Sequence, residues 1–275
     1  MLNRLFVVKK PVFISSNFYL NRVKRKYKNK KAGFSGTLDP FACGCLVVAF
    51  GQYSKLFRFL KKTPKSYRTT IWLGANSDSL DIENVYDIKD IEKLNQKDIE
   101  EKLQSLVGTL EYLPPKFSAK KIDGKRAYDL ARDGIDFEMK KVVSQVHDVH
   151  FINYNHPFIT FDITVSEGSY IRSMAQILLE KLNSVGTLSY LERLHEGQFK
   201  YDDEKALNPL EYLDLPTNNY TGTKEWFDMG KKLQIEYFET KDDGEYLIVF
   251  DSFFAVIEIK DNTPRYVLNK VLLND

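Results

Sequence analysis

The sequence predicts an α+β fold, in which a mixed or antiparallel sheet is flanked by helices and followed by a small β-rich domain. Segments with strand character outnumber helical ones, and the helical segments are scattered, which argues against a regular βαβ winding. After Pro209 only short strand-like runs remain, separated by turn residues. A chain of 275 residues has room for one large domain and a smaller one. We therefore predict domains over residues 1–209 and 210–275.

The N-terminal segment predicts a strand followed by a basic helix. Residues 3–8 are mostly apolar and stop before Pro11, which cannot take part in strand pairing. Ser15 or Ser16 can then cap a helix, because a serine oxygen accepts a hydrogen bond from the first helical amides. The helix has an apolar side and a basic side, made respectively of Phe18, Leu20, Val23 and Tyr27 and of Arg22, Lys24, Arg25, Lys26 and Lys28.

The remaining elements follow an irregular loop over residues 32–40, which contains two glycines and a proline. Strands are predicted over 45–50, 67–73, 142–153 and 158–165 and, in the small domain, over 247–250, 254–259 and 266–273. Helices are predicted over 52–62, 97–107 and 125–132, of which the last two end at Gly108 and Gly134. Two strands flank Asp123-Gly124, a dipeptide typical of hairpins.

Positive charge is concentrated near the N-terminus. Residues 1–70 hold sixteen Lys and Arg and a single acidic residue, although the whole chain has a net charge of only +2. Such a block indicates binding to RNA or DNA more naturally than to an anionic membrane, and its alternative reading is a solvated basic face. From residue 201 onward eight basic residues stand against sixteen acidic ones, which does not favour phosphate binding there.

Several functional classes find no support in the sequence. No apolar run approaches the roughly eighteen residues that span a membrane, and the N-terminus lacks the pattern of a secretory signal, so we expect a cytoplasmic protein. Cys43 and Cys45 are too few and too close together for a zinc site, and we expect packing thiols. With no metal pattern and no nucleotide-binding glycine loop, we expect neither a metal nor a cofactor.

Asp39 is the only carboxylate within residues 1–77, and it lies in the glycine-rich loop amid the strongest positive charge of the chain. Cationic neighbours favour the charged form of a carboxyl group, so we expect an ionised side chain ready for nucleophilic or base chemistry. The alternative is a turn aspartate that makes local hydrogen bonds before Pro40. Spacing alone leaves both readings open.

The segment around Asp39 matches a known catalytic motif. Residues 32–46, Ala-Gly-Phe-Ser-Gly-Thr-Leu-Asp-Pro-Phe-Ala-Cys-Gly-Cys-Leu, resemble the catalytic motif of the TruB family of pseudouridine synthases. Further matches follow the family's order and cover most of the chain, from about residue 3 to 197: Lys10-Pro11 with Ser15-Ser16, 65–68, 117–121 with 124–128, 168–173 and 190–194. The segment after Pro209 is placed like the small PUA-like domain of bacterial members.

The resemblance implies a function and assigns residues to it. It implies a tRNA pseudouridine synthase that isomerises uridine 55 in the T-loop after flipping it out of the stack. Asp39 would be the catalytic nucleophile, and Arg172, near the start of a helix capped by Ser169, would pair with it. Tyr67 would stack on the target uracil. The isomerisation needs no redox change and no external group, which agrees with a chain without cofactors.

Other residues would form the substrate pocket. By the same resemblance Tyr170 and Leu191 would line the base pocket, and we place Lys10 with them. Phe34 stands where family members usually have histidine. Phenylalanine cannot donate a hydrogen bond, but its ring can stack on or wedge against a base, so we expect a pocket wall there. This departure is expected to affect RNA affinity or preference more than the chemical step.

The expected partner is the T-arm of tRNA, bound without an obligate protein partner and by a chain that need not be more than a monomer. Phosphate contacts are expected from the basic residues of the N-terminal block, namely Lys24, Arg25, Lys28, Lys30 and Lys31. Two alternatives remain open. One is a tRNA-binding or tRNA-folding protein that has lost activity, and the other is the related guide-dependent synthase, which would be expected to carry a longer, basic C-terminal domain.

Overall fold

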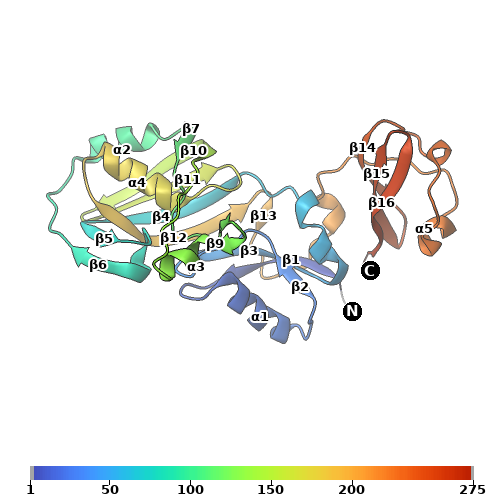
Figure 1. Cartoon of the computed structure of the whole chain (residues 1–275), viewed down its shortest axis with the longest axis horizontal. Coiled ribbons are helices and arrows are strands. Elements are labelled where there is room, and N and C mark those ends of the chain that lie inside the picture. The colour runs from blue at the N-terminus through green and yellow to red at the C-terminus, as the bar shows by residue number, and fades with distance from the viewer. Residues whose placement is uncertain (1–2, 274–275) are drawn as a thin grey trace.

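The computed structural model describes residues 3–273 and contains one large mixed sheet and a separate three-stranded sheet (Figure 1). The large sheet has nine strands in the order β1-β3-β12-β4-β11-β10-β7, with β2 paired to β3 and β13 paired to β12. Only the β12–β3 pair is parallel among these pairs. The strands are β1 Arg4–Lys10, β2 Ala32–Phe34, β3 Cys43–Phe50, β4 Lys65–Leu73, β7 Gly108–Tyr112, β10 Val142–Asn155, β11 Phe158–Val165, β12 Gly186–Glu196 and β13 Phe199–Lys200. The predicted α+β class is confirmed.

Strand β4 shows how the sequence separates the two faces of this sheet. Tyr67, Thr69 and Ile71 are buried on one face, whereas the side chain of Arg68 is exposed on the other. This alternation is the period of two that a half-covered strand requires. Helices α2 (Gln96–Gln104) and α4 (Ile171–Lys181) pack over the buried face and complete an apolar core with it (Figure 1). On the open face Arg68 pairs with Asp162 of β11 through two hydrogen bonds of 2.9 and 3.0 Å.

Helix α1 (Ser16–Lys26) has the cap that its sequence predicts, but one residue of the predicted apolar side is misplaced: Phe18 is 49% exposed, and the guanidinium of Arg22 lies over its ring. The Ser15 side chain accepts a hydrogen bond from the amide of Phe18 at 3.1 Å. Leu20 and Val23 are buried and share an apolar cluster with residues of β1 and β3. The basic side chains of its last turn remain on the outer side.

The helix predicted over residues 52–62 is wrong. Two short 3-10 helices stand there instead, η1 (Gly51–Lys55) and η2 (Phe57–Phe59). Their buried residues Tyr53, Leu56 and Phe59 recur every three positions. A 3-10 helix has three residues per turn and an α-helix 3.6, so side chains spaced by three lie directly above one another in the tighter form.

Two other helix boundaries differ from prediction. Helix α2 begins after its cap Asn95 and ends at Gln104, and Gly108 opens strand β7 instead of closing the helix. The predicted helix over 125–132 is shorter, because its first two residues form strand β9 (Lys125–Arg126), which pairs with β8 (Lys121–Ile122) across Asp123-Gly124. Helix α3 therefore covers only Ala127–Arg132. A second small hairpin consists of β5 (Ala75–Ser77) and β6 (Val85–Ile88), with η3 (Ile82–Asn84) just before β6.

The C-terminal part is an antiparallel sheet that packs against the start of the chain (Figure 1). Its strands are β14 Gly244–Val249, β15 Phe253–Lys260 and β16 Thr263–Leu272, preceded by the short helical segments η4 Pro209–Glu211, α5 Glu225–Met229 and η5 Ile235–Tyr237. Val7 and Tyr53 share one apolar core with Leu247, Phe254 and Val271. The three strands predicted here are present, while the boundary at residue 209 stays a prediction. Over residues 3–273, no helix has the length and apolar character to cross a membrane.

Candidate active site

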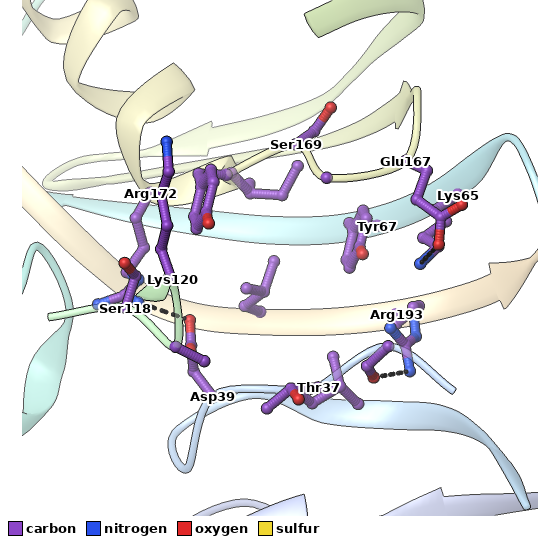
Figure 2. A pocket seen from close by; sticks show the side chains of 17 residues that line it. Thr37, Asp39, Lys65, Tyr67, Ser118, Lys120, Glu167, Ser169, Arg172 and Arg193 are labelled. Carbon is purple, nitrogen blue, oxygen red and sulfur yellow. Dashed lines mark hydrogen bonds and ion pairs between the residues drawn. The ribbon is translucent and has the colours of Figure 1, made fainter. Parts of the chain in front are cut away.

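A cavity of about 340 Å³ lies over the buried face of β4 and β12 (Figure 2). Its walls come from the loop between β2 and β3, the segment 118–120, and the turn 167–170 that leads into α4. Five of the predicted site residues line it together, although they are far apart in sequence: Asp39, Tyr67, Tyr170, Arg172 and Leu191. The structure therefore brings the main predicted constellation into one place.

Asp39 and Arg172 form an ion pair at one end of this cavity. Nη2 of Arg172 lies 3.0 Å from Oδ2 of Asp39. The arginine side chain is only 4% exposed, whereas that of Asp39 is 33% exposed and so faces the open space. Nη2 also donates to the carbonyl oxygen of Phe117 at 2.8 Å, which fixes the plane of the guanidinium. One carboxylate oxygen is thus held while the group remains accessible.

The other half of the guanidinium is held by a second carboxylate, Asp81. Nη1 of Arg172 lies 3.0 Å from Oδ2 of Asp81 and donates to the carbonyl oxygen of Ser79 at 2.6 Å. Asp81 is buried, and its other oxygen accepts hydrogen bonds from the Ser79 hydroxyl at 2.7 Å and from the amide of Glu83 at 3.0 Å. A planar guanidinium can bridge two carboxylates in this way, which a lysine ammonium cannot do with the same geometry.

Burial raises the pKa of Asp39 above its usual range, and Asp81 adds to this rise while Arg172 and Lys10 oppose it. The positive charge of the segment therefore does not set the direction of this shift, and the expected ionised form of Asp39 stays a prediction. Most of the sixteen basic residues lie on the surface, where water screens them, whereas the carboxyl group itself sits in a poorly solvated pocket. Arg172 is the group that keeps the anionic form accessible.

The middle of the cavity offers flat and apolar surfaces. Tyr67 projects from β4 between the Asp39 end and the opposite, charged end (Figure 2). Leu191 of β12 is buried beside the cavity, and Tyr170 is half-buried at its wall. Burial also raises the pKa of the Tyr170 hydroxyl, so it stays protonated. An aromatic ring with an aliphatic wall is suited to a planar base.

Two predicted residues occupy other positions. Lys10 is fully buried, and its Nζ donates to the carbonyl oxygens of Pro11, Ile14 and Pro40 at 2.9, 2.6 and 3.2 Å. It has no surface to offer a substrate and instead ties the first loop to the residue after Asp39. Ser169 does not cap α4, because its hydroxyl donates to the carbonyl oxygen of Ser166 at 2.8 Å.

Phe34 lies beside a second, larger cavity of about 910 Å³ and is absent from the first. The second cavity adjoins the first, since Asp39, Ser118 and Arg172 line both. Its outer walls come from the start of α1 and from α3. Phe34 therefore lines the cavity that Asp39 also borders, and Tyr67 lines only the first one.

The basic residues predicted to bind RNA lie on α1 and just after it. A shallow groove beside the helix is lined by Lys24, Arg25, Lys28 and Lys30, with the half-exposed ring of Phe18. Lys31 is exposed outside this groove. Within residues 3–273 none of these five cations is paired with an acidic side chain.

Metal-binding groups do not gather in the described chain. Within residues 3–273 there is no cluster of three or more His, Cys, Asp or Glu side chains that could hold a metal ion. Cys43 and Cys45 are both buried and free, which confirms that they are packing thiols. The Sγ atom of Cys45 lies 2.9 Å from the carbonyl oxygen of Leu194, against the neighbouring strand.

Comparison with known proteins agrees with this geometry. Residues 24–171, more than half of the chain, match the model described as TruB family pseudouridylate synthase, N-terminal domain. The chain belongs to the TruB family. Two relatives called tRNA pseudouridine synthase B, one from a Sulfurovum species and one from a Nitratiruptor species, are 56% and 53% identical over 270 residues. Each alignment covers 98% of this chain and 98% of the relative.

Solved structures of TruB-like fold are more distant in sequence. The structure described as "Crystal Structure of a Cbf5-Nop10-Gar1 Complex" matches with a TM-score of 0.67 at 16% identity, over 98% of this chain and 84% of the other. The structure described as "Structure of H/ACA RNP bound to a substrate RNA containing 2'-deoxyuridine" matches with a TM-score of 0.63 at 15% identity, over 98% and 85%. At such identities the likeness establishes the fold.

The sequence alone did not indicate two residues of the TruB-type site. Asp81 follows the β5 strand without any local motif, and its part depends on a contact with Arg172, ninety-one positions away. Lys120 also lines the cavity. It lies in segment 117–121, which resembles a motif of the TruB family but for which the resemblance implies no role. Only a model of the pairing between distant segments would have identified Asp81.

Proposed function

We propose that this chain isomerises uridine 55 in the T-loop of tRNA to pseudouridine, with Asp39 as the nucleophile. The observation that carries the proposal is the Asp39–Arg172 pair, which presents an accessible carboxylate in a cavity with an aromatic wall. Membership of the TruB family supports the reaction type. The names of the relatives support tRNA as the substrate.

The shape of the site supports base flipping. The cavity is a recess with Asp39 and Tyr67 on its walls, and a base within a stacked helix cannot reach these groups. Flipping costs a few kcal/mol, which phosphate contacts along α1 and stacking on Tyr67 can offset. Stacking of one base on an aromatic side chain contributes about 1–3 kcal/mol.

The reaction itself is an internal exchange of bonds. The N1–C1′ bond of the nucleotide breaks, the uracil rotates, C5 bonds to C1′, and the proton from C5 is lost while N1 gains one. Asp39 either adds covalently to the base or the sugar, or removes the proton at C2′ of the sugar to give a glycal. Deuterium at C2′ separates the two routes, because only proton removal from C2′ gives a primary isotope effect on the single-turnover rate.

The test uses unmodified tRNA transcript, wild type and Asp39→Asn, without added metal or cofactor. Pseudouridine is mapped by carbodiimide treatment and primer extension, and RNA binding is measured in parallel. We expect product at the T-loop uridine with wild type only, and binding by both proteins. Asp162→Asn is the matched control, because Asp162 also pairs with an arginine but lies on the open face of the same sheet.

The outcomes separate the candidate functions. Product at another uridine would contradict the T-loop assignment but keep the enzyme class. Binding without any product would favour a tRNA-binding protein and direct attention to Phe34. Loss of product in Asp162→Asn as well as in Asp39→Asn would remove the argument for a special role of Asp39. Size-exclusion chromatography of the tRNA complex tests the expected monomer.

A further inference from the structure

A buried ion cluster lies at the end of the cavity away from Asp39 and Arg172 (Figure 2). Its centre is Glu196, whose side chain is 0% exposed. Nζ of Lys65 lies 3.2 Å from Oε1 of Glu196, and Nη2 of Arg193 lies 3.3 Å from Oε2. Glu167, at the rim, lies 3.6 Å from Nζ of Lys65 and 3.3 Å from Nζ of Lys62.

An irregularity in β12 places these groups together. In a regular strand, residues three apart such as Arg193 and Glu196 point to opposite faces. The pairing of β12 with β4 shifts between Arg193 and His195, so that Arg193 lies opposite Tyr67 and Glu196 opposite Lys65. A bulge of this kind redirects side chains, and here both are directed to the face that carries the cavity.

The cluster is bonded directly to the loop that carries Asp39. The Ser35 hydroxyl donates to Oε1 of Glu196 at 2.6 Å. Arg193 donates through Nη2 to the carbonyl oxygen of Gly36 at 3.0 Å and through Nε to that of Cys45 at 2.8 Å. The cluster therefore holds the loop just before Asp39 and also the strand β3 that follows it.

The loop packs on the cluster without intervening space. Gly36 has a φ of +58°, and a Cβ atom there would lie 2.9 Å from Nη1 of Arg193 and 3.0 Å from Nζ of Lys65. On the other side of the loop, the amide of Leu38 donates to the Ser16 hydroxyl at 2.9 Å. The segment before Asp39 is thus fastened at two places that do not involve Arg172.

Stability alone does not account for such a cluster. Removing ions from water is costly, and well-packed apolar residues generally stabilise a core as well as a buried ion pair or better. Charged groups do offer directed hydrogen bonds, which fix the position of a backbone segment more closely than apolar contacts do. The hydrogen bonds from Ser35 to Oε1 of Glu196 and from Arg193 to the carbonyl oxygen of Gly36 are of this kind, and both end on the loop that carries Asp39. Oε2 of Glu196 faces Arg193 only as an ion pair, without a hydrogen bond.

We infer that Glu196 is a positioning residue, which acts through Ser35 and Arg193 to hold the loop so that Asp39 meets the flipped nucleotide in one orientation. This inference rests on the proposed function. Effects on the chemical step are expected to exceed effects on binding, because misplacement of a reacting group by about 1 Å can cost about 100-fold in rate.

The test compares two hydrogen bonds of serine hydroxyls that have the same length, 2.6 Å. Ser35→Ala removes the bond to Glu196 of β12. Ser66→Ala removes the bond between β4 and Thr164 of β11, on the face of the sheet away from the cavity. We expect Ser35→Ala to lower the single-turnover rate at least about tenfold with RNA affinity within about threefold. Ser35→Thr, which restores a hydroxyl, should recover most of the rate, and Ser66→Ala should leave it unchanged.

Hydrogen exchange of residues 35–38 gives a readout without substrate. Ser35→Ala and Glu196→Gln should speed exchange there, while Ser66→Ala should not. Equal rate losses in Ser35→Ala and Ser66→Ala, or unchanged exchange and rate in Ser35→Ala, would overturn the inference. If Glu196→Gln fails to fold, the serine pair still decides. A wild type that forms no pseudouridine would refute the proposed function, whereas the exchange data would still report whether the cluster holds the loop.

Discussion

Arg172 approaches Asp39 to 3.0 Å from a helix that begins 132 positions later in the chain, and it does so with a side chain that is almost completely buried. The pair is asymmetric, since the carboxylate faces the cavity and the guanidinium does not. Arg172 is therefore a support for Asp39, and its two Nη atoms also bind Asp81 and the backbone carbonyls of Ser79 and Phe117.

Replacing Arg172 with lysine should reduce activity strongly. Lysine keeps the charge but cannot bridge Asp39 and Asp81 with two fixed donors. We expect a fall of about 100-fold in the single-turnover rate with RNA affinity little changed, because the guanidinium lies behind the substrate site. Rapid-quench assays and filter binding measure the two quantities. A large loss of affinity with an unchanged rate would contradict this.

Asp81→Asn should shift the pH profile of the reaction. Asp81 contributes to the raised pKa of Asp39, so its neutralisation lowers that pKa. Asp39 must be ionised to act, and activity is lost as pH falls through its pKa in the folded enzyme. The acidic limb should therefore move to lower pH in the variant, with a slower rate on the plateau because Arg172 loses its second anchor. An acidic limb that moves upward would contradict the assignment.

Lys10→Met should change how stability depends on pH. Burial lowers the pKa of Lys10 to about 8 from its ordinary 10.5. Between about pH 8 and pH 10.5 the unfolded chain therefore binds more protons at Lys10 than the folded chain does, so the free energy of unfolding rises with pH. The stability that Lys10 contributes is fully present above pH 10.5 and is lost as pH falls through about 8. Urea unfolding between pH 7 and 10 should show a smaller rise in stability for the variant than for wild type. Parallel curves would contradict the shifted pKa.

Removing three cations from α1 should weaken tRNA binding and its salt dependence. The variant replaces Lys24, Arg25 and Lys28 with alanine. Each phosphate contact contributes about 0.9 to the slope of the logarithm of the binding constant against the logarithm of salt concentration. The magnitude of this slope should therefore fall by about 2 to 3. The control replaces Lys231, Lys232 and Lys241, which are exposed in the C-terminal part. Equal effects of the two triple variants would indicate a general charge effect without a defined binding face.

Phe34→Ala should raise KM more than it lowers kcat. The ring borders the second cavity, and the groups that hold Arg172 are Asp39, Asp81 and backbone carbonyls, so we expect loss of the ring to remove a surface for RNA without displacing Asp39. Steady-state kinetics with T-arm RNA measures both constants. A selective loss of kcat would instead assign Phe34 to the chemical step.

The sequence predicted those features that depend on local pattern. The Ser15 cap, the alternation in β4 and the motif around Asp39 are each contained in a few consecutive residues. Features that depend on distant contacts were missed or misread. The contact of Asp81 with Arg172 has no local signal in the sequence. Lys10 is predicted to bind substrate, but its burial depends on tertiary contacts such as that with Pro40, which the sequence does not show.

The pKa of Asp39 illustrates the same limit. Charge counted along the chain favours the ionised carboxylate, but burial, which no count of charges reveals, is the largest influence on this pKa and raises it. Likewise, the apolar spacing in residues 52–62 was read as an α-helix although it fits a three-residue turn. Sequence pattern identified five residues that the structure brings together around one cavity, and the structure was needed to show how they are supported.

The contact between the two ends of the chain has a consequence for biosynthesis. The Asn3 side chain donates to the carbonyl oxygen of Leu272 at 3.0 Å, and Val271 belongs to the same apolar core as Leu5. A nascent chain can form this contact only after its last strand has left the ribosome. Until then the apolar surface of β1 and β3 on that side is covered only by earlier segments such as η1 and η2, and the part left exposed makes the unfinished chain prone to association.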